Sequence, residues 1–349
     1  MKKMGMWIGL LAALIIFIAA NIFYNKIDEL TGSDTMSNKK TMIEMSGEFG
    51  DYNAEESIDD PAHDPSIFKA DDTYYVVSTG IARETDNPGG IYIRKSEESI
   101  GGPWEAIGEI PVPEWAKKYQ VGHLWAPHVV EKDGVFYMYY AVSVFGTNNS
   151  AIGVSKTETP GDLNSWEDLG TVVTSGPGVS YNAIDPMVFE ADGTWWMVFG
   201  SHFGGIVLQE LDNMTELTGE VYTIASRQST TAHNAIEGPT IFERDGYFYL
   251  ITSWDQCCNG VDSTYKVAVG RAESVTGPYV DPDGEELLNG GGEVILETYE
   301  NQIGPGGQDI LEEDGTYYMV YHYYDGDADG VIRMQIREIN FNNDWPSFK

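Results

Sequence analysis

The chain is poor in cysteine. Its 349 residues include only two, Cys257 and Cys258, and these are adjacent. Neighbouring cysteines rarely form an ordinary bridge with each other, because disulfide geometry is demanding. Two cysteines also provide no disulfide framework, so stability is expected to come from a hydrophobic core, for which a chain of this length is sufficient.

The chain is also poor in positive charge. Lysine and arginine number 20 against 55 aspartate and glutamate residues, which gives a formal charge of −35. A surface this acidic repels phosphate backbones, so the sequence predicts no nucleic-acid partner. It repels polyuronates in the same way and therefore favours a neutral substrate. Solubility or adaptation to salt explains the charge equally well.

Several catalytic signatures are missing as well. The sequence has no Gly-x-Ser-x-Gly elbow, P-loop or nucleotide fingerprint in a suitable context, and no His-Glu-x-x-His or Cys-x-x-Cys pair. No stretch beyond the N-terminus has helical periodicity. These absences leave serine hydrolase, nucleotide-dependent and zinc-protease chemistry without support.

The N-terminal region differs from the rest of the chain. Lys2 and Lys3 precede an apolar run that ends near Phe23, which is the order found in signal peptides. The run, about 17 residues, is at the lower limit of a membrane-spanning helix. We therefore interpret residues 1–24 as an export signal or a membrane anchor, with a buried core helix as a third interpretation. Either of the first two would make the protein secreted, or anchored on the extracytoplasmic side. Residues 25–60 are polar and acidic and are predicted to be a tether.

One short pattern recurs five times over the remaining chain. Each copy consists of an apolar stretch, a two-residue turn and an aromatic stretch. The turn pairs align without gaps at Asp71-Asp72, Asp133-Gly134, Asp192-Gly193, Asp245-Gly246 and Asp314-Gly315. An Asp-Gly turn between strand patterns is a strong hairpin signal, and a second hairpin follows most copies. Two hairpins make one blade, so residues 61–349 are predicted to form an all-β, five-bladed β-propeller, with a β-sandwich as the alternative.

Three copies carry an acid at or beside the same position. Asp64 and Asp185 open the first strand of copies one and three, and Glu237 stands one residue earlier in copy four. First strands line the channel of a propeller, so these carboxylates are predicted to converge there. Three acids suit glycoside hydrolysis, in which one activates water, one protonates the leaving oxygen and one keeps the acid's pKa high. Taken singly, each acid would be assigned to a turn.

The residues around these acids resemble glycoside hydrolase family 43, and more narrowly its endo-1,5-α-L-arabinanases. The resemblance is carried by HDPS at 63–66, WAP at 125–127, NAID at 182–185, EGP at 237–239 and SWDQCCNG at 253–260. It implies endo-hydrolysis of α-1,5-linked arabinan with inversion of configuration. The exo-acting arabinanases, the α-L-arabinofuranosidases and the β-xylosidases of the same family remain alternatives. So does a sugar-binding propeller without catalysis.

The resemblance also implies a role for individual residues. Asp64 would be the general base, Glu237 the general acid, and Asp185 the residue that raises the acid's pKa and orients it. Trp125 would stack on an arabinose ring. The other substrate-binding residues would be Gly146, Asn182, Ala183, Ile184, Ser201, His202 and Phe203. His322 matches a histidine near a channel metal, usually calcium, most of whose ligands would be water oxygens. The expected partner is arabinan or its oligosaccharides, and the expected state is a monomer.

Some positions depart from the family pattern. His128 follows Trp-Ala-Pro where an aspartate is usual, and His202 stands where an aromatic residue is usual. Phe203 often corresponds to a tryptophan. Gly307 follows Gly304-Pro305-Gly306 at a position where the family often has histidine. These positions lie near the expected cleft, so they affect the expected specificity and metal site more than the reaction.

Overall fold

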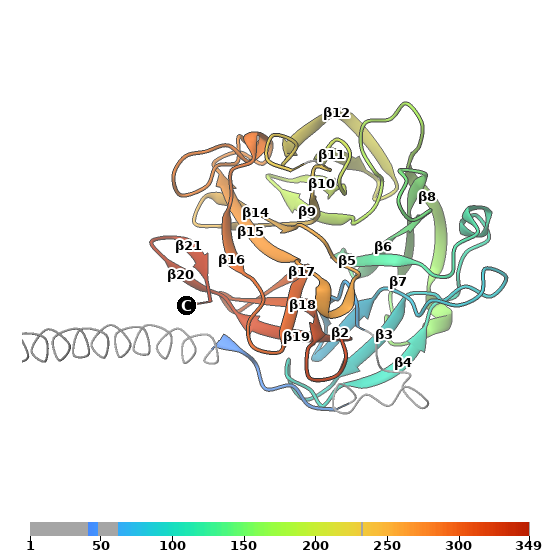
Figure 1. Ribbon diagram of the computed structural model, residues 1–349. Coiled ribbons are helices and arrows are strands. Elements are labelled where there is room, and N and C mark those ends of the chain that lie inside the picture. Colours follow the sequence, from blue (N-terminus) through green and yellow to red (C-terminus); the bar gives the residue numbers. More distant parts are fainter. Residues whose placement is uncertain (1–40, 48–61, 232, 349) are drawn as a thin grey trace, which may run out of the picture.

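The computed structural model describes residues 41–47, 62–231 and 233–348 (Figure 1). The predicted signal or anchor at residues 1–24 and most of the predicted tether lie outside the described residues. Among the described residues, no helix is both long and apolar enough to cross a membrane.

The chain is an all-β, five-bladed β-propeller, which confirms the predicted fold (Figure 1). Each blade is an antiparallel meander in chain order. Blades one and two consist of β1 (Ser66–Ala70), β2 (Thr73–Ser78), β3 (Tyr92–Ser96), β4 (Glu105–Glu109), β5 (Trp125–Lys132), β6 (Val135–Ser143), β7 (Ser150–Thr157) and β8 (Glu167–Ser175). Blades three to five consist of β9 (Met187–Ala191), β10 (Thr194–Phe199), β11 (Ile206–Asp212), β12 (Glu216–Ala225), β13 (Ile236–Arg244), β14 (Tyr247–Trp254), β15 (Lys266–Ala272), β16 (Glu293–Leu296), β17 (Gln302–Glu313), β18 (Thr316–Asp325) and β19 (Val331–Glu338).

The first strand of each blade lies innermost and contacts the first strands of both neighbouring blades. The contacts run from β1 to β5, β9, β13 and β17, and β17 returns to β1, so the ring is closed. The short 3-10 helices in the connections are η1 (Ala116–Tyr119), η2 (Leu163–Ser165), η3 (Gly260–Asp262) and η4 (Leu287–Asn289). A final hairpin, β20 (Asn340–Asn342) with β21 (Trp345–Ser347), packs on blade four, where Tyr249 donates a hydrogen bond to the main-chain oxygen of Asp344 (2.6 Å).

The predicted Asp-Gly turns explain the first hairpin of blades two to five. In blade two, Asp133 and Gly134 have φ of 54° and 81°, and the Asp-Gly turns of blades three to five are alike. Two consecutive positive φ values are typical of the turn that matches strand twist, and aspartate and glycine adopt them at low cost. The sequence pattern thus sets the register of the two inner strands.

A second backbone feature repeats at the channel. The residues that open the five copies all have a left-handed backbone, with φ between 41° and 57°: Asp64, Ala126, Asp185, Gly238 and Gly307. Left-handed backbone is uncommon for residues other than glycine. Its recurrence at one position of every copy shows that the five copies are structurally equivalent.

The hydrophobic core is divided among the five contacts between blades. Five separate clusters of buried side chains lie there, centred on residues such as Val76, Met138, Met197, Leu208 and Ile251. Burying one such side chain stabilises a fold by about 1.5–3 kcal/mol. Packing between blades therefore replaces the missing disulfide framework as the source of stability.

Residues 41–47, which fall within the predicted tether, pack on the propeller instead. Met42 pairs with Arg337 of β19, and the Ile43 N–H donates to the main-chain oxygen of Ile336 (2.9 Å). Ile43 and Met45 also pack into the cluster between blades five and one. This short stretch therefore lies along β19, the outer strand of three-stranded blade five. It packs there because Ile43 and Met45 are large and apolar, whereas the rest of the predicted tether is mostly polar.

Candidate active site

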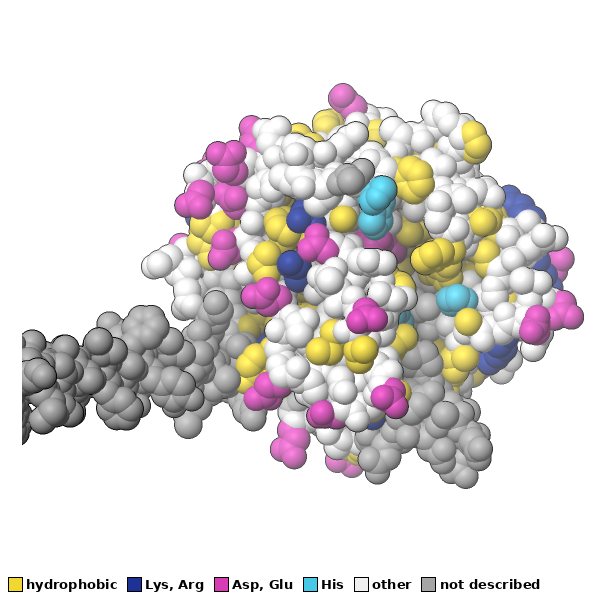
Figure 2. All heavy atoms as spheres, viewed as in Figure 1, with side chains coloured by type: hydrophobic (Ala, Val, Ile, Leu, Met, Phe, Trp, Pro, Cys, Tyr) yellow, Lys and Arg dark blue, Asp and Glu magenta, His cyan; other side chains and the backbone are white. Residues whose placement is uncertain are grey.

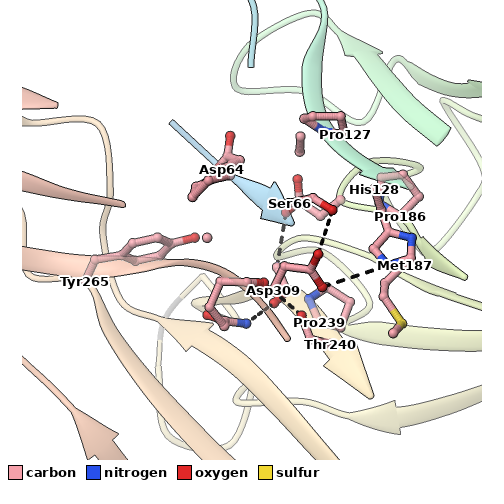
Figure 3. Close-up of a pocket in the computed structure, with 16 residues that line it drawn as sticks. Asp64, Ser66, Pro127, His128, Pro186, Met187, Pro239, Thr240, Tyr265 and Asp309 are labelled. Atoms are coloured by element: carbon pink, nitrogen blue, oxygen red, sulfur yellow. Dashed lines mark hydrogen bonds and ion pairs between the residues drawn. The ribbon is translucent and has the colours of Figure 1, made fainter. Parts of the chain in front are cut away.

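A cavity lies on the channel axis where the five inner strands begin (Figure 3). Its walls are the first three residues of each copy together with Tyr265. Asp64 and Asp185 line it directly. Glu237 lies beside it, since Gly238 and the Tyr265 ring that contacts Glu237 belong to the wall. The structure therefore brings the three predicted acids together.

Asp64 is held by donors that reach a single carboxylate oxygen. The hydroxyl of Thr79 donates to Oδ2 (2.7 Å), and Nδ1 of His63 lies 2.7 Å from the same atom. The Asp64 main-chain N–H donates to Nδ1 of His322 (3.1 Å). Among the described residues Oδ1 accepts no hydrogen bond, so it is the oxygen available to a water molecule.

Burial alone would raise the pKa of Asp64. The charge and hydrogen bond of His63, together with the Thr79 hydroxyl, outweigh burial and hold the pKa of Asp64 well below its usual range. The carboxylate is therefore ionised at neutral pH, as a general base must be.

Asp185 has the opposite setting. Burial, the neighbouring charge of Glu237 and that of Asp64 raise the pKa of Asp185 well above its usual range. One hydrogen bond opposes this rise, from the Gly238 N–H to Oδ2 (3.1 Å). Like charges in a low-dielectric site disfavour each other's ionisation, so this setting favours the protonated form of Asp185.

Glu237 lies in β13 and is 9% exposed. Its Oε1 accepts a hydrogen bond from the hydroxyl of Tyr265 (2.7 Å), and its Oε2 accepts one from Ser201 (2.6 Å). Nε2 of His202 lies 3.5 Å from Oε2. A side chain at Gly306 would overlap the Tyr265 ring, so glycine is needed there for Tyr265 to reach the acid.

The predicted substrate-binding residues fall into two groups. Trp125 is half-buried and contacts Phe145 edge to face, with ring centroids 6.3 Å apart, next to Gly146 in the β6–β7 loop. Phe203 is exposed in the β10–β11 loop. These residues do not line the cavity themselves, but Trp125 directly precedes Ala126 of its wall and Phe203 directly follows His202, which lies beside Glu237.

The second group consists of Asn182, Ala183, Ile184, Ser201 and His202, which pack in the protein around the acids. Asn182 is buried and accepts a hydrogen bond from Ser150 (2.6 Å). Ala183 and Ile184 belong to the hydrophobic cluster between blades two and three, so the structure does not bring them to the cavity. Ser201 and His202 contact Glu237 and help to position it.

His128, which departs from the family pattern, packs between blades and contacts two of them. It is buried on β5, its Nδ1 accepts a hydrogen bond from the Val188 N–H (3.3 Å), and its Nε2 lies 3.8 Å from Asp309. Burial lowers the pKa of His128. Asp309 in turn accepts a hydrogen bond from Ser66 (2.6 Å; Figure 3), so His128 and Asp309 join four blades around the cavity.

His322 was expected near a metal. It is fully buried on β18, and burial lowers the pKa of His322 well below its usual range. Its Nδ1 accepts the hydrogen bond from Asp64, so the neutral ring has its proton on Nε2, which has no partner among the described residues. Such a ring donates and does not fit direct ligation of a cation. Within the group His63, Asp64 and His322, whose ligand atoms lie close together, the Asp64 carboxylate is the donor that suits a hard cation.

Some residues of the site were not singled out from the sequence. Thr79 and Tyr265 contact the proposed base and acid directly. Thr79, Ser253 and His322 each stand eight residues after the first residue of their turn, and each contributes a polar contact at the channel. That shared spacing was the signal in the sequence that could have identified Thr79.

The two cysteines correct another expectation. Cys257 and Cys258 are joined by a disulfide, although adjacent cysteines were not expected to pair. The β14–β15 loop turns sharply at this point, with Cys258 in left-handed backbone (φ 65°), and this brings the two sulfurs together.

The chain is similar to known proteins in both sequence and fold. The family model described as glycosyl hydrolases family 43 matches residues 57–346. The extracellular endo-α-(1→5)-L-arabinanase 1 of Bacillus subtilis is 38% identical over 82% of this chain and 87% of its own length. An extracellular exo-α-(1→5)-L-arabinofuranosidase of Cellvibrio japonicus is 36% identical over 81% and 85%. The solved structure of a family 43 endo-arabinanase from Bacillus licheniformis has a TM-score of 0.75 and 38% identity, covering 87% of this chain and 99% of that one.

Proposed function

The chain belongs to the glycosyl hydrolases of family 43, and on that premise we propose that it hydrolyses α-1,5-linked arabinan as an inverting endo-arabinanase. One observation carries the proposal. Two acids at equivalent repeat positions, Asp64 and Asp185, have pKa values shifted in opposite directions, beside a third acid that is buried and hydrogen-bonded. Separated pKa values among clustered carboxyls are typical of paired acid and base catalysis.

In the proposed reaction, Oδ1 of Asp64 takes a proton from a water molecule, which attacks the anomeric carbon. Glu237 protonates the departing oxygen. We assign to Asp185, whose charge interacts with that of Glu237, the role of keeping the proton on the acid and orienting it. Direct attack by water on the face opposite the leaving group inverts the configuration.

The choice of arabinan is supported by the relatives, several of which are named for action on α-1,5-arabinan. Both endo- and exo-acting enzymes are among them at similar identity. We favour endo action because two exposed rings on different blades would give a polymer contacts beyond the cut bond: Phe145, which contacts Trp125, and Phe203, which follows the His202 beside Glu237. The net charge of −35 is compatible with a neutral polysaccharide.

Product sizing on linear arabinan tests this proposal. Endo action should release short oligosaccharides of several lengths early, with a rapid fall in viscosity. Arabinose as the sole early product would contradict endo action and favour the exo-acting alternative. Hydrolysis of xylan oligomers but not of arabinan would reject the substrate. Proton NMR of the first-formed anomer tests the mechanism, because retained configuration would exclude direct attack by water.

Two further predictions remain part of the proposal. We expect the protein to act outside the cytoplasm, since two relatives are named extracellular, and cell fractionation with an antibody checks this. We also keep calcium as a prediction. A chelator should lower the melting temperature or activity, and calcium but not magnesium should restore it. If a chelator changes neither the melting temperature nor the activity, the prediction of calcium is wrong.

A further inference from the structure

The β14–β15 loop presents apolar groups that the proposed reaction does not use. Cys257 and Cys258 form a disulfide, Cys258 is exposed, and Val261 in the same loop is 50% exposed. A disulfide has no polar hydrogen, and its sulfur atoms are soft and polarisable. The disulfide and Val261 therefore present apolar groups to solvent within a loop that is otherwise polar.

The disulfide lies beside the proposed base. Sγ of Cys258 is 3.9 Å from Nε2 of His63, and Nδ1 of the same imidazole is 2.7 Å from Oδ2 of Asp64. The Cys258 N–H donates to the hydroxyl of Tyr324 (2.7 Å), which lies 3.0 Å from His63. Only one side chain separates the sulfurs from Asp64, and hydrogen bonds hold them in that place.

The loop also lies across the channel from Trp125. It starts in blade four and is bonded to Tyr324 of blade five, and neither of these blades adjoins blade two, which carries Trp125 (Figure 1). A sugar chain that stacks on Trp125 and passes over the acids would leave the cavity toward the disulfide.

Exposed apolar groups recur on the same connection of successive blades. The loop between the second and third strands exposes Phe145 in blade two (78%), Phe203 in blade three (44%) and Val261 in blade four. A single exposed hydrophobic residue is ordinary, whereas several around one mouth indicate a contact surface. Figure 2 shows hydrophobic side chains and histidines around the centre of this face.

We propose that the Cys257–Cys258 disulfide and Val261 form the wall of a further sugar subsite. It binds an arabinosyl residue of the polymer on the opposite side of the cut bond from the residue on Trp125. The ring's apolar C–H face rests on the sulfurs, while its hydroxyls remain in water. This subsite rests on the proposed arabinan hydrolysis and adds length recognition to it.

The test compares oligosaccharides of increasing length. The Cys257→Ser/Cys258→Ser variant should have a KM for arabinohexaose about tenfold higher than the unchanged protein, from the loss of one apolar contact. Its KM for arabinotriose and its kcat for both substrates should change little. Calorimetry with arabinohexaose in a Glu237→Gln background should show the same loss of affinity without turnover.

Val261→Ser provides a second, milder variant, with Val221→Ser as its control. Val221 is similarly exposed (43%) but lies on the outer strand β12. We expect a threefold rise in the hexaose KM for Val261→Ser and none for Val221→Ser. If the double serine variant does not fold, this pair decides the matter.

Two outcomes would overturn the subsite. Unchanged KM values at every length would show that the disulfide and Val261 make no contact with sugar. An equal fall in kcat at every length, with KM unchanged, would show that the disulfide acts only on His63 and Asp64. Absence of activity and binding in the unchanged protein would instead reject the arabinan proposal itself, so the two failures are distinguishable.

Discussion

Asp64 and Asp185 have nearly the same backbone and opposite chemistry. Both stand two residues before an inner strand, both precede proline, and their φ angles are 48° and 56°. Yet the pKa of Asp64 is held well below its usual range, and the pKa of Asp185 is raised well above it. The repeat therefore fixes where a carboxyl stands, and does not fix whether it is ionised.

The difference comes from residues outside the repeated pattern. Asp64 accepts a hydrogen bond from Thr79, which directly follows β2, and lies against His63. Among the described residues, Asp185 accepts a hydrogen bond only from the Gly238 N–H, and it faces the charge of Glu237. Donors favour the charged form, and an acid neighbour disfavours it. An ionised base and a group that keeps a proton thus stand on one rim, because different blades supply their neighbours.

Removing the two proposed catalytic groups should have the largest effect and separate their roles. Asp64→Ala and Glu237→Ala should each lower kcat on linear arabinan by about 10²- to 10⁴-fold, because each removes a proton-transfer step. On an aryl arabinoside whose leaving phenol needs no protonation, Glu237→Ala should recover most of its activity and Asp64→Ala should not. Reducing-sugar and phenol-release assays measure both.

Matched behaviour of these variants on both substrates would contradict the assignment of acid and base. Circular dichroism and melting curves serve as the fold control. Azide offers a further check, since it can replace water as a nucleophile that needs no base and should restore only Asp64→Ala.

Gly307 tests how closely the Asp64 side of the cavity is packed. A Cβ there would lie 2.5 Å from Oδ1 of Asp64 and 2.7 Å from Nδ1 of His322, with φ at 56°. Gly307→Ala should therefore lower kcat by about 10- to 100-fold, because displacing the base by a fraction of an ångström disrupts its alignment. Gly315→Ala is the control: its φ is 79° and a Cβ there meets nothing within 4 Å.

Both alanine variants bear the cost of a left-handed backbone, about 1–2 kcal/mol. Gly307→Ala bears the cost of the close contacts as well, so it should lose more melting temperature than Gly315→Ala, and only Gly307→Ala should lose activity. Equal activities would show that Asp64 tolerates displacement and that its surroundings are less important than its charge.

The fold and the three acids could be predicted because they depend on local pattern. The turn pairs such as Asp133-Gly134 fix hairpin register, and five copies in register admit few architectures. The one-residue offset of Glu237 was also visible in the sequence. In the structure Gly238 has the left-handed position, and Glu237, one residue before it, turns to Ser201 and Tyr265.

The remainder could not be predicted because it depends on contacts between distant residues. Tyr265 reaches Glu237 only because Gly306 has no side chain, which no local pattern reveals. Residues 41–47 were assigned to a tether from their surroundings in sequence, although Ile43 and Met45 pack between two blades. The disulfide depends on the path of one loop, and adjacent cysteines alone argue against it.

Thr79 allows a smaller test of the donors around Asp64. Its hydroxyl donates to Asp64 Oδ2 (2.7 Å) and accepts from the Ala126 N–H (2.8 Å). Thr79→Val keeps the shape and removes the hydroxyl, so kcat should fall about tenfold with KM nearly unchanged. Thr79→Ser keeps the hydroxyl and should retain most activity. A serine variant as impaired as the valine variant would show that shape rather than hydrogen bonding matters.

The smallest expected effect is on stability, and it has opposite signs for the two aspartates. The pKa of Asp64 is below its ordinary value of 3.8, so its ionised form stabilises the fold at pH above about 4, and this contribution is lost as pH falls. The pKa of Asp185 is raised, so its carboxyl destabilises the fold increasingly as pH rises above about 4.

At pH 7, Asp64→Asn should lower the melting temperature and Asp185→Asn should raise it, each by about 2–6 °C. Both differences should shrink as the pH is lowered toward 3, where the unfolded chain is protonated as well. Scanning calorimetry of the two variants at pH 7 and pH 3 measures this. Shifts of the same sign at pH 7 would mean that the pKa values of Asp64 and Asp185 are not shifted in opposite directions. The assignment of different roles to the two aspartates would then be wrong.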